Sequence, residues 1–261
     1  MSKIIHKALS YKVREILIDV YNQLGSVYPE AIYQEAITHG LTTHGILCTP
    51  EKPFDFIYRE IVAGTYQVDH WVEEGKILLE IKVAPKIKPI HKAQALSYLK
   101  LTDADLAIVV NFGAKSLQDE RLPNFLRSQN KTVNFQWQPF SLTQDSFINE
   151  IDKTLHQVRL RLGSGFIHRV YRQALKVELQ YQGFNYEFLH QIPIHYCGHF
   201  VGMQDVQLIK IENKVLLGAF AVKMIDDKMR LKMRAYLKQL SMKVGLLANF
   251  YGKRLIMEII Q

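Results

Sequence analysis

The sequence repeats itself at a constant spacing of 138 positions, and this repeat limits what the chain can fold into. Without a gap, Gly25-Ser26 corresponds to Gly163-Ser164, and Tyr98-Leu99-Lys100 corresponds to Tyr236-Leu237-Lys238. A constant offset over most of two halves indicates that a whole domain was duplicated. We therefore predict two tandem domains, residues 1–138 and 139–261, each large enough to bury its own core.

Both halves show the same expected order of helices and strands. Apolar residues recur at helical spacing in the helical segments, and branched residues dominate the strands. The elements expected in the first half are helices within 13–24, 29–40 and 91–101, and strands 66–72, 77–83 and 106–112. The stretch from about 114 to 145 has no clear counterpart, and we expect it to finish the first domain and link it to the second. The mixture predicts an α/β fold.

The charge of the chain favours a polyanionic partner such as nucleic acid. The formal net charge is +8, and it is unevenly distributed. Residues 1–138 contain 16 basic and 15 acidic residues, whereas the remainder contains 17 and 10. The second half therefore holds most of the excess positive charge, which attracts phosphate. The alternative is a basic surface that serves only solubility.

The apolar segments and the cysteines bear on the compartment. No apolar stretch is long enough to span a membrane, and the first residues do not resemble a signal peptide. Cys48 and Cys197 are the only cysteines, and they do not occupy equivalent positions. Without a disulfide framework, a reducing interior is expected. We predict a cytoplasmic protein with no membrane partner.

Three charged residues on the two central strands form a candidate catalytic site. Asp69 lies on the strand before the polar turn 73–76, and Glu80 and Lys82 lie on the strand after it. Side chains alternate along a strand, so Glu80 and Lys82 share a face, and a hairpin brings Asp69 across from Glu80. Two carboxylates suit Mg²⁺, which keeps several waters for the reaction. Lys82 could stabilise phosphate charge or orient and deprotonate the attacking water.

The second copy lacks these charges. Asp69 corresponds to Gln207, Glu80 to Gly218 and Lys82 to Phe220, while Glu30 corresponds to His168. The scaffold therefore does not need these residues, although they stand among strongly apolar neighbours where charges require a reason. This contrast favours a chemical role for them over a solvated strand edge.

The combination Asp69…Glu80-Ile81-Lys82 resembles the signature of the PD-(D/E)xK nuclease superfamily. The segment from Gly25 through Glu30 to Tyr33 resembles the GxxExxY branch of that superfamily. The first copy departs at Val27, where the branch commonly has a glycine that the second copy keeps as Gly165. The resemblance covers about residues 10–115 and 148–253. It implies two tandem restriction-endonuclease-like domains, each a mixed central sheet flanked by helices.

The resemblance also implies roles for individual residues. Glu30 would join Asp69 and Glu80 at the metal, with Mg²⁺ as cofactor and Mn²⁺ as a substitute. The segment Gln94-Ala-Leu-Ser-Tyr98 resembles the Gln-x-x-x-Tyr element of RecB-like nucleases, so Gln94 would orient a phosphate or a water. Tyr98 is kept as Tyr236 where the charges are lost, which favours packing for this residue.

Two further groups of residues lie in the second copy. A predicted helix carries a basic run that could contact phosphates or be an ordinary solvated face; its residues are Arg230, Lys232, Arg234 and Lys238. His195, Cys197 and His199 alternate along a predicted strand, but no fourth zinc ligand is evident.

The sequence thus predicts a Mg²⁺-dependent nuclease that acts on nucleic acid, with DNA favoured over RNA. The first copy would carry Asp69, Glu80, Lys82, Glu30 and Gln94, and the degenerate second copy would help to bind the substrate in an intramolecular pseudo-dimer. The alternative is a non-catalytic nucleic-acid-binding or scaffold protein on the same fold.

Overall fold

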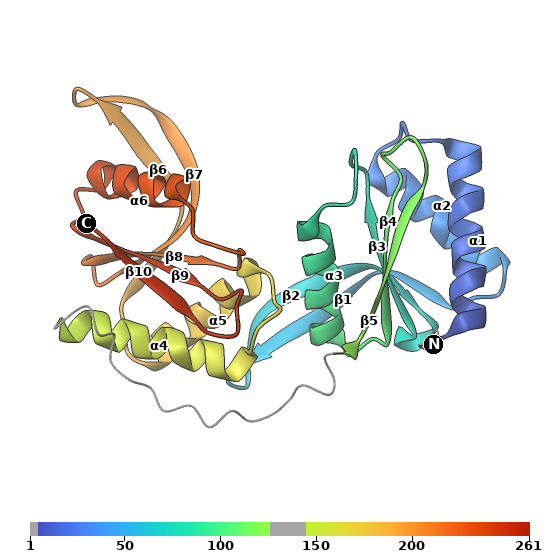
Figure 1. Ribbon diagram of the computed structural model, residues 1–261, viewed down its shortest axis with the longest axis horizontal. Coiled ribbons are helices and arrows are strands. Elements are labelled where there is room, and N and C mark those ends of the chain that lie inside the picture. The colour runs from blue at the N-terminus through green and yellow to red at the C-terminus, as the bar shows by residue number, and fades with distance from the viewer. Residues whose placement is uncertain (1–4, 126–144) are drawn as a thin grey trace. The chain divides into compact units, whose positions relative to one another are not determined.

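The computed structural model describes residues 5–125 and 145–261 and shows two compact units with one element order (Figure 1). The first contains α1 (Lys7–Leu24), α2 (Glu30–Thr43), β1 (Cys48–Tyr58), β2 (Ile61–Val72), the short 3₁₀ turn η1 (Glu73–Gly75), β3 (Ile77–Lys82), α3 (Pro89–Thr102), β4 (Leu106–Asn111) and β5 (Gln118–Pro123). The second contains α4 (Ser146–Leu162), α5 (His168–Tyr181), β6 (Tyr186–Tyr196), β7 (His199–Ile211), β8 (Val215–Phe220), α6 (Asp227–Gln239), β9 (Val244–Asn249) and β10 (Ile256–Ile260).

Each unit is built on one five-stranded mixed sheet. The order in the first is β1-β2-β3-β4-β5, with β3 and β4 parallel and the pairs β2–β3 and β4–β5 antiparallel. The second sheet has the matching order β10-β9-β8-β7-β6, and its only parallel pair among the described strands is β8–β9. The predicted fold, two tandem domains with a mixed sheet flanked by helices, is confirmed.

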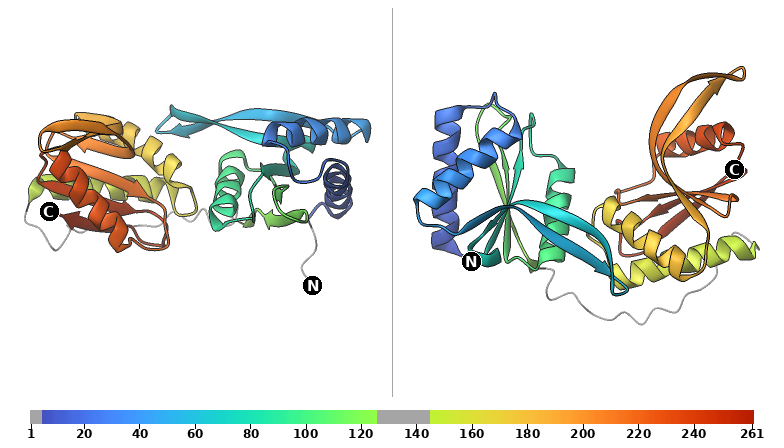
Figure 2. Two further views of the ribbon diagram at one scale, coloured as in Figure 1. Left: turned by 90° about the horizontal axis from the view of Figure 1, so that it is seen from above. Right: turned by 180° about the vertical axis from the view of Figure 1, so that it is seen from behind.

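Alternation along β3 explains how helices cover both faces of the first sheet. Ile77, Leu79 and Ile81 are fully buried in a core that includes side chains of α1 and α2. The residues between them point to the opposite face, where α3 lies (Figures 1 and 2). Burying one large aliphatic side chain stabilises the fold by about 1.5–3 kcal/mol, so this strand needs a covering on both sides.

The turn between β2 and β3 sets the register of the central hairpin. Glu73, Glu74 and Gly75 all have positive φ, and the ring of Trp71 packs directly against Gly75, where a side chain would collide with it. The resulting antiparallel pairs include His70 with Leu79. Continuing this register places Asp69 opposite Glu80, as the position of the turn in the sequence predicts.

The repeat extends further than the sequence pattern indicates. β5 and β10 differ by the same 138 positions, so part of the stretch 114–145 does have a counterpart. The long strands β1 and β6, which no expected range covers, also correspond. The expected boundary between residues 138 and 139 lies outside the described residues. In the described part of the chain, no helix is both long and apolar enough to cross a membrane.

The end of the β1–β2 hairpin, Tyr58–Ala63, groups with the second unit, whereas the rest of both strands belongs to the first. Within the second unit, Arg59 binds the fully buried carboxylate of Glu178 on α5 through two nitrogens, at 2.6 and 2.8 Å. The hydroxyl of Tyr58 donates to the same carboxylate at 2.7 Å. This buried acid is therefore paired and hydrogen-bonded, as burial of a charge requires.

Candidate active site

Asp69 and Glu80 lie side by side on β2 and β3, on the sheet face that α3 covers. Glu80 is completely buried in the middle of an otherwise apolar strand. Asp69 is held by a hydrogen bond of 2.6 Å from the backbone N–H of Ile81 to its Oδ2. The predicted pairing of these two acids across the hairpin agrees with the structure, and both carboxylates are placed by strand backbone rather than by a loop.

Lys82 completes the group at the end of β3. Its Nζ lies 2.5 Å from Oε1 of Glu80 and donates to the backbone carbonyl of Ile81 at 2.6 Å. Apart from this ion pair, neither carboxylate oxygen of Glu80 has a hydrogen-bond partner among the described residues. Buried carboxylate oxygens are nearly always hydrogen-bonded or bound to a metal. The oxygens of Glu80 and Asp69 therefore fit a hard divalent cation.

The pKa values of Asp69, Glu80 and Lys82 also favour a bound cation. Burial raises the pKa of Asp69 to about 6, against the opposing effects of the Ile81 N–H and Lys82. Burial and the neighbouring Asp69 raise the pKa of Glu80 to about 8. Burial alone would lower the pKa of Lys82, but Glu80 and Asp69 outweigh it and raise that pKa above its usual value. A cation would stabilise the ionised form of these two neighbouring carboxyl groups, which burial and mutual repulsion disfavour.

Two further glutamates act on this pair from neighbouring elements. Glu30, the first residue of α2, contributes to the raised pKa of both Asp69 and Glu80. Glu51 on β1 also raises the pKa of Asp69, and it adopts an unusual positive φ of 46°. Sequence reasoning missed Glu51, although its replacement by Leu189 in the second copy was a usable signal.

The structure does not gather three acidic side chains at one point. Among residues 5–125 and 145–261, no three His, Cys, Asp or Glu side chains are close enough to form a metal-binding group. Asp69 and Glu80 are thus brought together without Glu30, whose direct metal contact remains a prediction.

The helix α3 places its polar residues on the same side of the sheet. Gln94 donates to the hydroxyl of Tyr98 at 3.2 Å, as expected for positions four apart on one helix face. Tyr98 is almost fully buried and packs edge-on against Tyr66, in line with the packing role expected for it. Glu80 helps to raise the pKa of Tyr98, after the larger effect of burial, so this face of α3 lies near the acidic pair.

In the second copy, apolar groups fill the equivalent place. Gly218 replaces Glu80, and a methyl group at this position would lie 2.6 Å from Cε2 of Phe220, the residue that replaces Lys82. The same methyl group would lie 3.3 Å from the end of Met233, which corresponds to Ala95. The side chains of Phe220 and Met233 therefore occupy the space next to Gly218.

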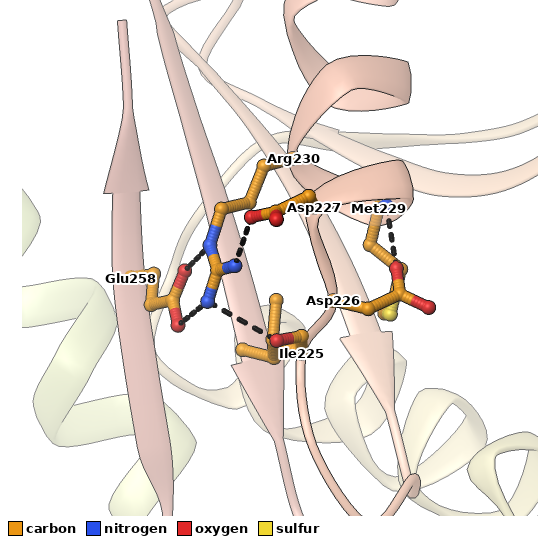
Figure 3. A network of polar contacts seen from close by, with 6 residues as sticks. All are labelled: Ile225, Asp226, Asp227, Met229, Arg230 and Glu258. Atoms are coloured by element: carbon orange, nitrogen blue, oxygen red, sulfur yellow. Dashed lines mark hydrogen bonds and ion pairs between the residues drawn. The ribbon is translucent and has the colours of Figure 1, made fainter.

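The basic helix α6 divides into one internally bound arginine and several exposed side chains. Arg230 binds Glu258 on β10 through Nε and Nη2, at 2.8 and 2.9 Å, and its Nη1 binds Asp227 at 2.8 Å (Figure 3). Its Nη2 also donates to the carbonyl of Ile225. All three guanidinium nitrogens are thus engaged, so a phosphate would have to displace these partners. The structure gives Arg230 the role of holding α6 on β10.

The other basic residues of α6 remain available. Lys232, Arg234 and Lys238 are exposed and form no ion pair within the described ranges. His195, Cys197 and His199 do not share one strand, because β6 ends at Tyr196 and Cys197 lies in the turn before β7. The described residues contain no metal-binding group there either, so the zinc site considered from their spacing is not formed.

A protein-family model matches both copies of the repeat. A family model described as the PD-(D/E)XK nuclease superfamily matches twice, over residues 7–122 and 145–260. Among solved structures, the crystal structure of SSO0001 matches with 15% identity and a TM-score of 0.25, over 50% of this chain and 91% of that one. Comparison with curated protein sequences gives no match.

Proposed function

Because the chain belongs to the PD-(D/E)XK nuclease superfamily, we propose that its first copy is a metal-dependent nuclease that hydrolyses phosphodiester bonds in DNA. The observation that supports this most strongly is the buried Asp69–Glu80 pair, whose Glu80 oxygens have no polar partner among the described residues besides Lys82. Such an arrangement costs stability unless a cation binds. Membership of the GxxExxY branch is part of the proposal, because Glu30 and Tyr33 fit that pattern. Val27 is the one position that departs from it.

The proposed chemistry assigns one task to each side chain. Asp69 and Glu80 would hold Mg²⁺ or Mn²⁺, which would act as a Lewis acid and lower the pKa of a water molecule. Lys82 remains protonated at neutral pH, as its raised pKa indicates. It is therefore better suited to stabilise the negative charge that develops on the phosphate than to remove a proton. Gln94 orients the scissile phosphate or the water, and Glu30 adds negative charge from α2.

The second copy is proposed to be a pseudonuclease that contributes to substrate binding. It lacks the acidic pair and carries most of the excess positive charge, so no carboxylate pair repels phosphate at the equivalent positions. Lys232, Arg234 and Lys238 are the side chains proposed to contact the nucleic-acid backbone. The two copies would then act as a pseudo-dimer within one chain.

Calorimetric titration with Mn²⁺ tests the metal site directly. We expect one binding site in the full chain and none in Asp69→Ala, whereas Gln207→Ala, the matched change in the second copy, should bind as wild type does. Binding requires both acids to lose their protons, so affinity should rise as the pH increases through about 6 and then about 8. Equal binding by Asp69→Ala and wild type would contradict the assignment.

A non-catalytic nucleic-acid-binding or scaffold role is the second candidate. The departure at Val27 and the filled second site favour it. It predicts nucleic-acid binding without Mn²⁺ binding, so the same titration separates the two functions.

A further inference from the structure

His70 forms a buried polar contact between the strand and the helix that carry the proposed acids. It follows Asp69 on β2 and is completely buried, with its side chain on the face that α2 covers. Its Nε2 lies 2.9 Å from the hydroxyl of Thr38 and 3.1 Å from the backbone carbonyl of Gln34, both on α2. The Thr38 hydroxyl also lies 2.9 Å from that carbonyl.

The hydrogen-bond geometry determines which ring nitrogen carries the proton. The Thr38 hydroxyl donates to the Gln34 carbonyl, so it can only accept from the His70 ring. Nε2 therefore carries the proton, and Nδ1 is left as a buried acceptor without a hydrogen-bond partner in the described part of the chain. A buried acceptor without a partner costs about 1–3 kcal/mol.

The second copy shows that the fold does not require this histidine. In the second sheet Ile209 pairs with Leu217, the counterpart of Leu79, so Ile209 takes the place of His70, and Lys176 replaces Thr38. Ile209 is completely buried, so the same place in the fold is filled by an apolar side chain without a polar contact. The histidine is retained only in the copy that also retains the acids, despite the cost of its Nδ1.

We propose that His70 is a positioning residue for the metal site, an inference that rests on the proposed nuclease function. Its bond to Thr38 fixes α2, which carries Glu30, against β2, which carries Asp69. His70 is also paired in the sheet with Leu79, the residue before Glu80. The residue thus links the three elements, β3 through its backbone pairing and α2 through its ring, whose carboxylates must keep a common geometry when a cation binds.

The substitution His70→Leu, which places an apolar side chain here as Ile209 does in the second copy, tests this role. We expect a melting temperature equal to or above that of wild type, because the orphaned Nδ1 is removed, together with Mn²⁺ affinity and cleavage that are each lowered about 10-fold or more. Thr38→Val should weaken Mn²⁺ binding less, because it removes one acceptor of Nε2 and leaves the Gln34 carbonyl. His70→Gln should restore part of the affinity, since its amide can donate from a similar position.

The outcomes separate this inference from the function on which it rests. Wild-type Mn²⁺ affinity in both His70→Leu and Thr38→Val would overturn the positioning role alone. A lowered melting temperature with unchanged Mn²⁺ affinity would also overturn it, because His70 would then act only in packing. Failure of the wild-type chain to bind Mn²⁺ would overturn the proposed metal site, and the role of His70 with it.

Discussion

Glu80→Gln is expected to lower the rate of cleavage by about 10³-fold or more, while leaving DNA affinity within about twofold of wild type. Glutamine keeps the shape of the side chain but removes a charge that the cation needs. By contrast, Lys232→Glu combined with Arg234→Glu should weaken binding and reduce the slope of log affinity against log salt by about two, one for each lost phosphate contact. Affinity measured at several salt concentrations for both variants distinguishes these effects.

A matched control and a stability measurement sharpen this prediction. Lys12→Glu with Lys115→Glu changes the net charge equally but lies in the first copy, so its salt slope should change less. In chelator, Glu80→Gln should also be more stable than wild type above about pH 8. The folded-state pKa of Glu80 exceeds its unfolded value. The contribution of Glu80 to the free energy of unfolding is therefore fully present below about pH 4.5 and is lost as the pH rises through about 8. Glutamine has no such loss, and identical pH profiles would argue against a strained acid at this position.

Gly218→Glu is expected to destabilise the second unit by about 3–5 kcal/mol, without creating a second active site. The new side chain would collide with Phe220 and Met233, and its carboxylate would be buried without the lysine that accompanies Glu80. Denaturant unfolding provides the measurement. Lys232→Glu, which adds a glutamate at an exposed position of the same unit, should change stability by less than about 0.5 kcal/mol.

The double variant Gly218→Glu with Phe220→Lys completes this test. It restores both residues of the first copy on β8, yet Met233 still occupies the space of Ala95, and continuing the β7–β8 register places Leu208 rather than an acid across from residue 218. In a Glu80→Gln background we expect no recovery of cleavage. Recovered cleavage would mean that the second copy is closed only by these two residues.

The parts of the site that follow from local pattern could be predicted from the sequence. Alternation along β3 and the turn at residues 73–76 were sufficient to place Glu80 across from Asp69. The constant offset was sufficient to identify the second copy. Periodicity did not reveal β5, because the sequence of Gln118–Pro123 is mostly polar and lacks an apolar alternation.

Features that depend on distant partners could not be predicted. Arg230 looks like any other basic residue of α6 until Glu258 is placed beside it on β10. In the second copy, the ring of Phe220 packs against Gly218 and occupies the space next to it. The spacing of these residues in the sequence does not specify this ring position. The sequence shows only that His70 follows Asp69, and its bond to α2 becomes visible in the fold. Glu51 escaped notice because its strand was not foreseen.

Cleavage of DNA by the purified full chain, in Mg²⁺ or Mn²⁺ and in chelator, tests the central claim most directly. Linear, circular and single-stranded substrates should be compared, with Asp69→Asn as the variant and Gln207→Asn as its counterpart in the second copy. We predict metal-dependent cleavage of at least one substrate by wild type and Gln207→Asn, and none by Asp69→Asn or in chelator. Cleavage that persists in Asp69→Asn, or DNA binding by the wild-type chain without cleavage of any substrate in either metal, would contradict the account.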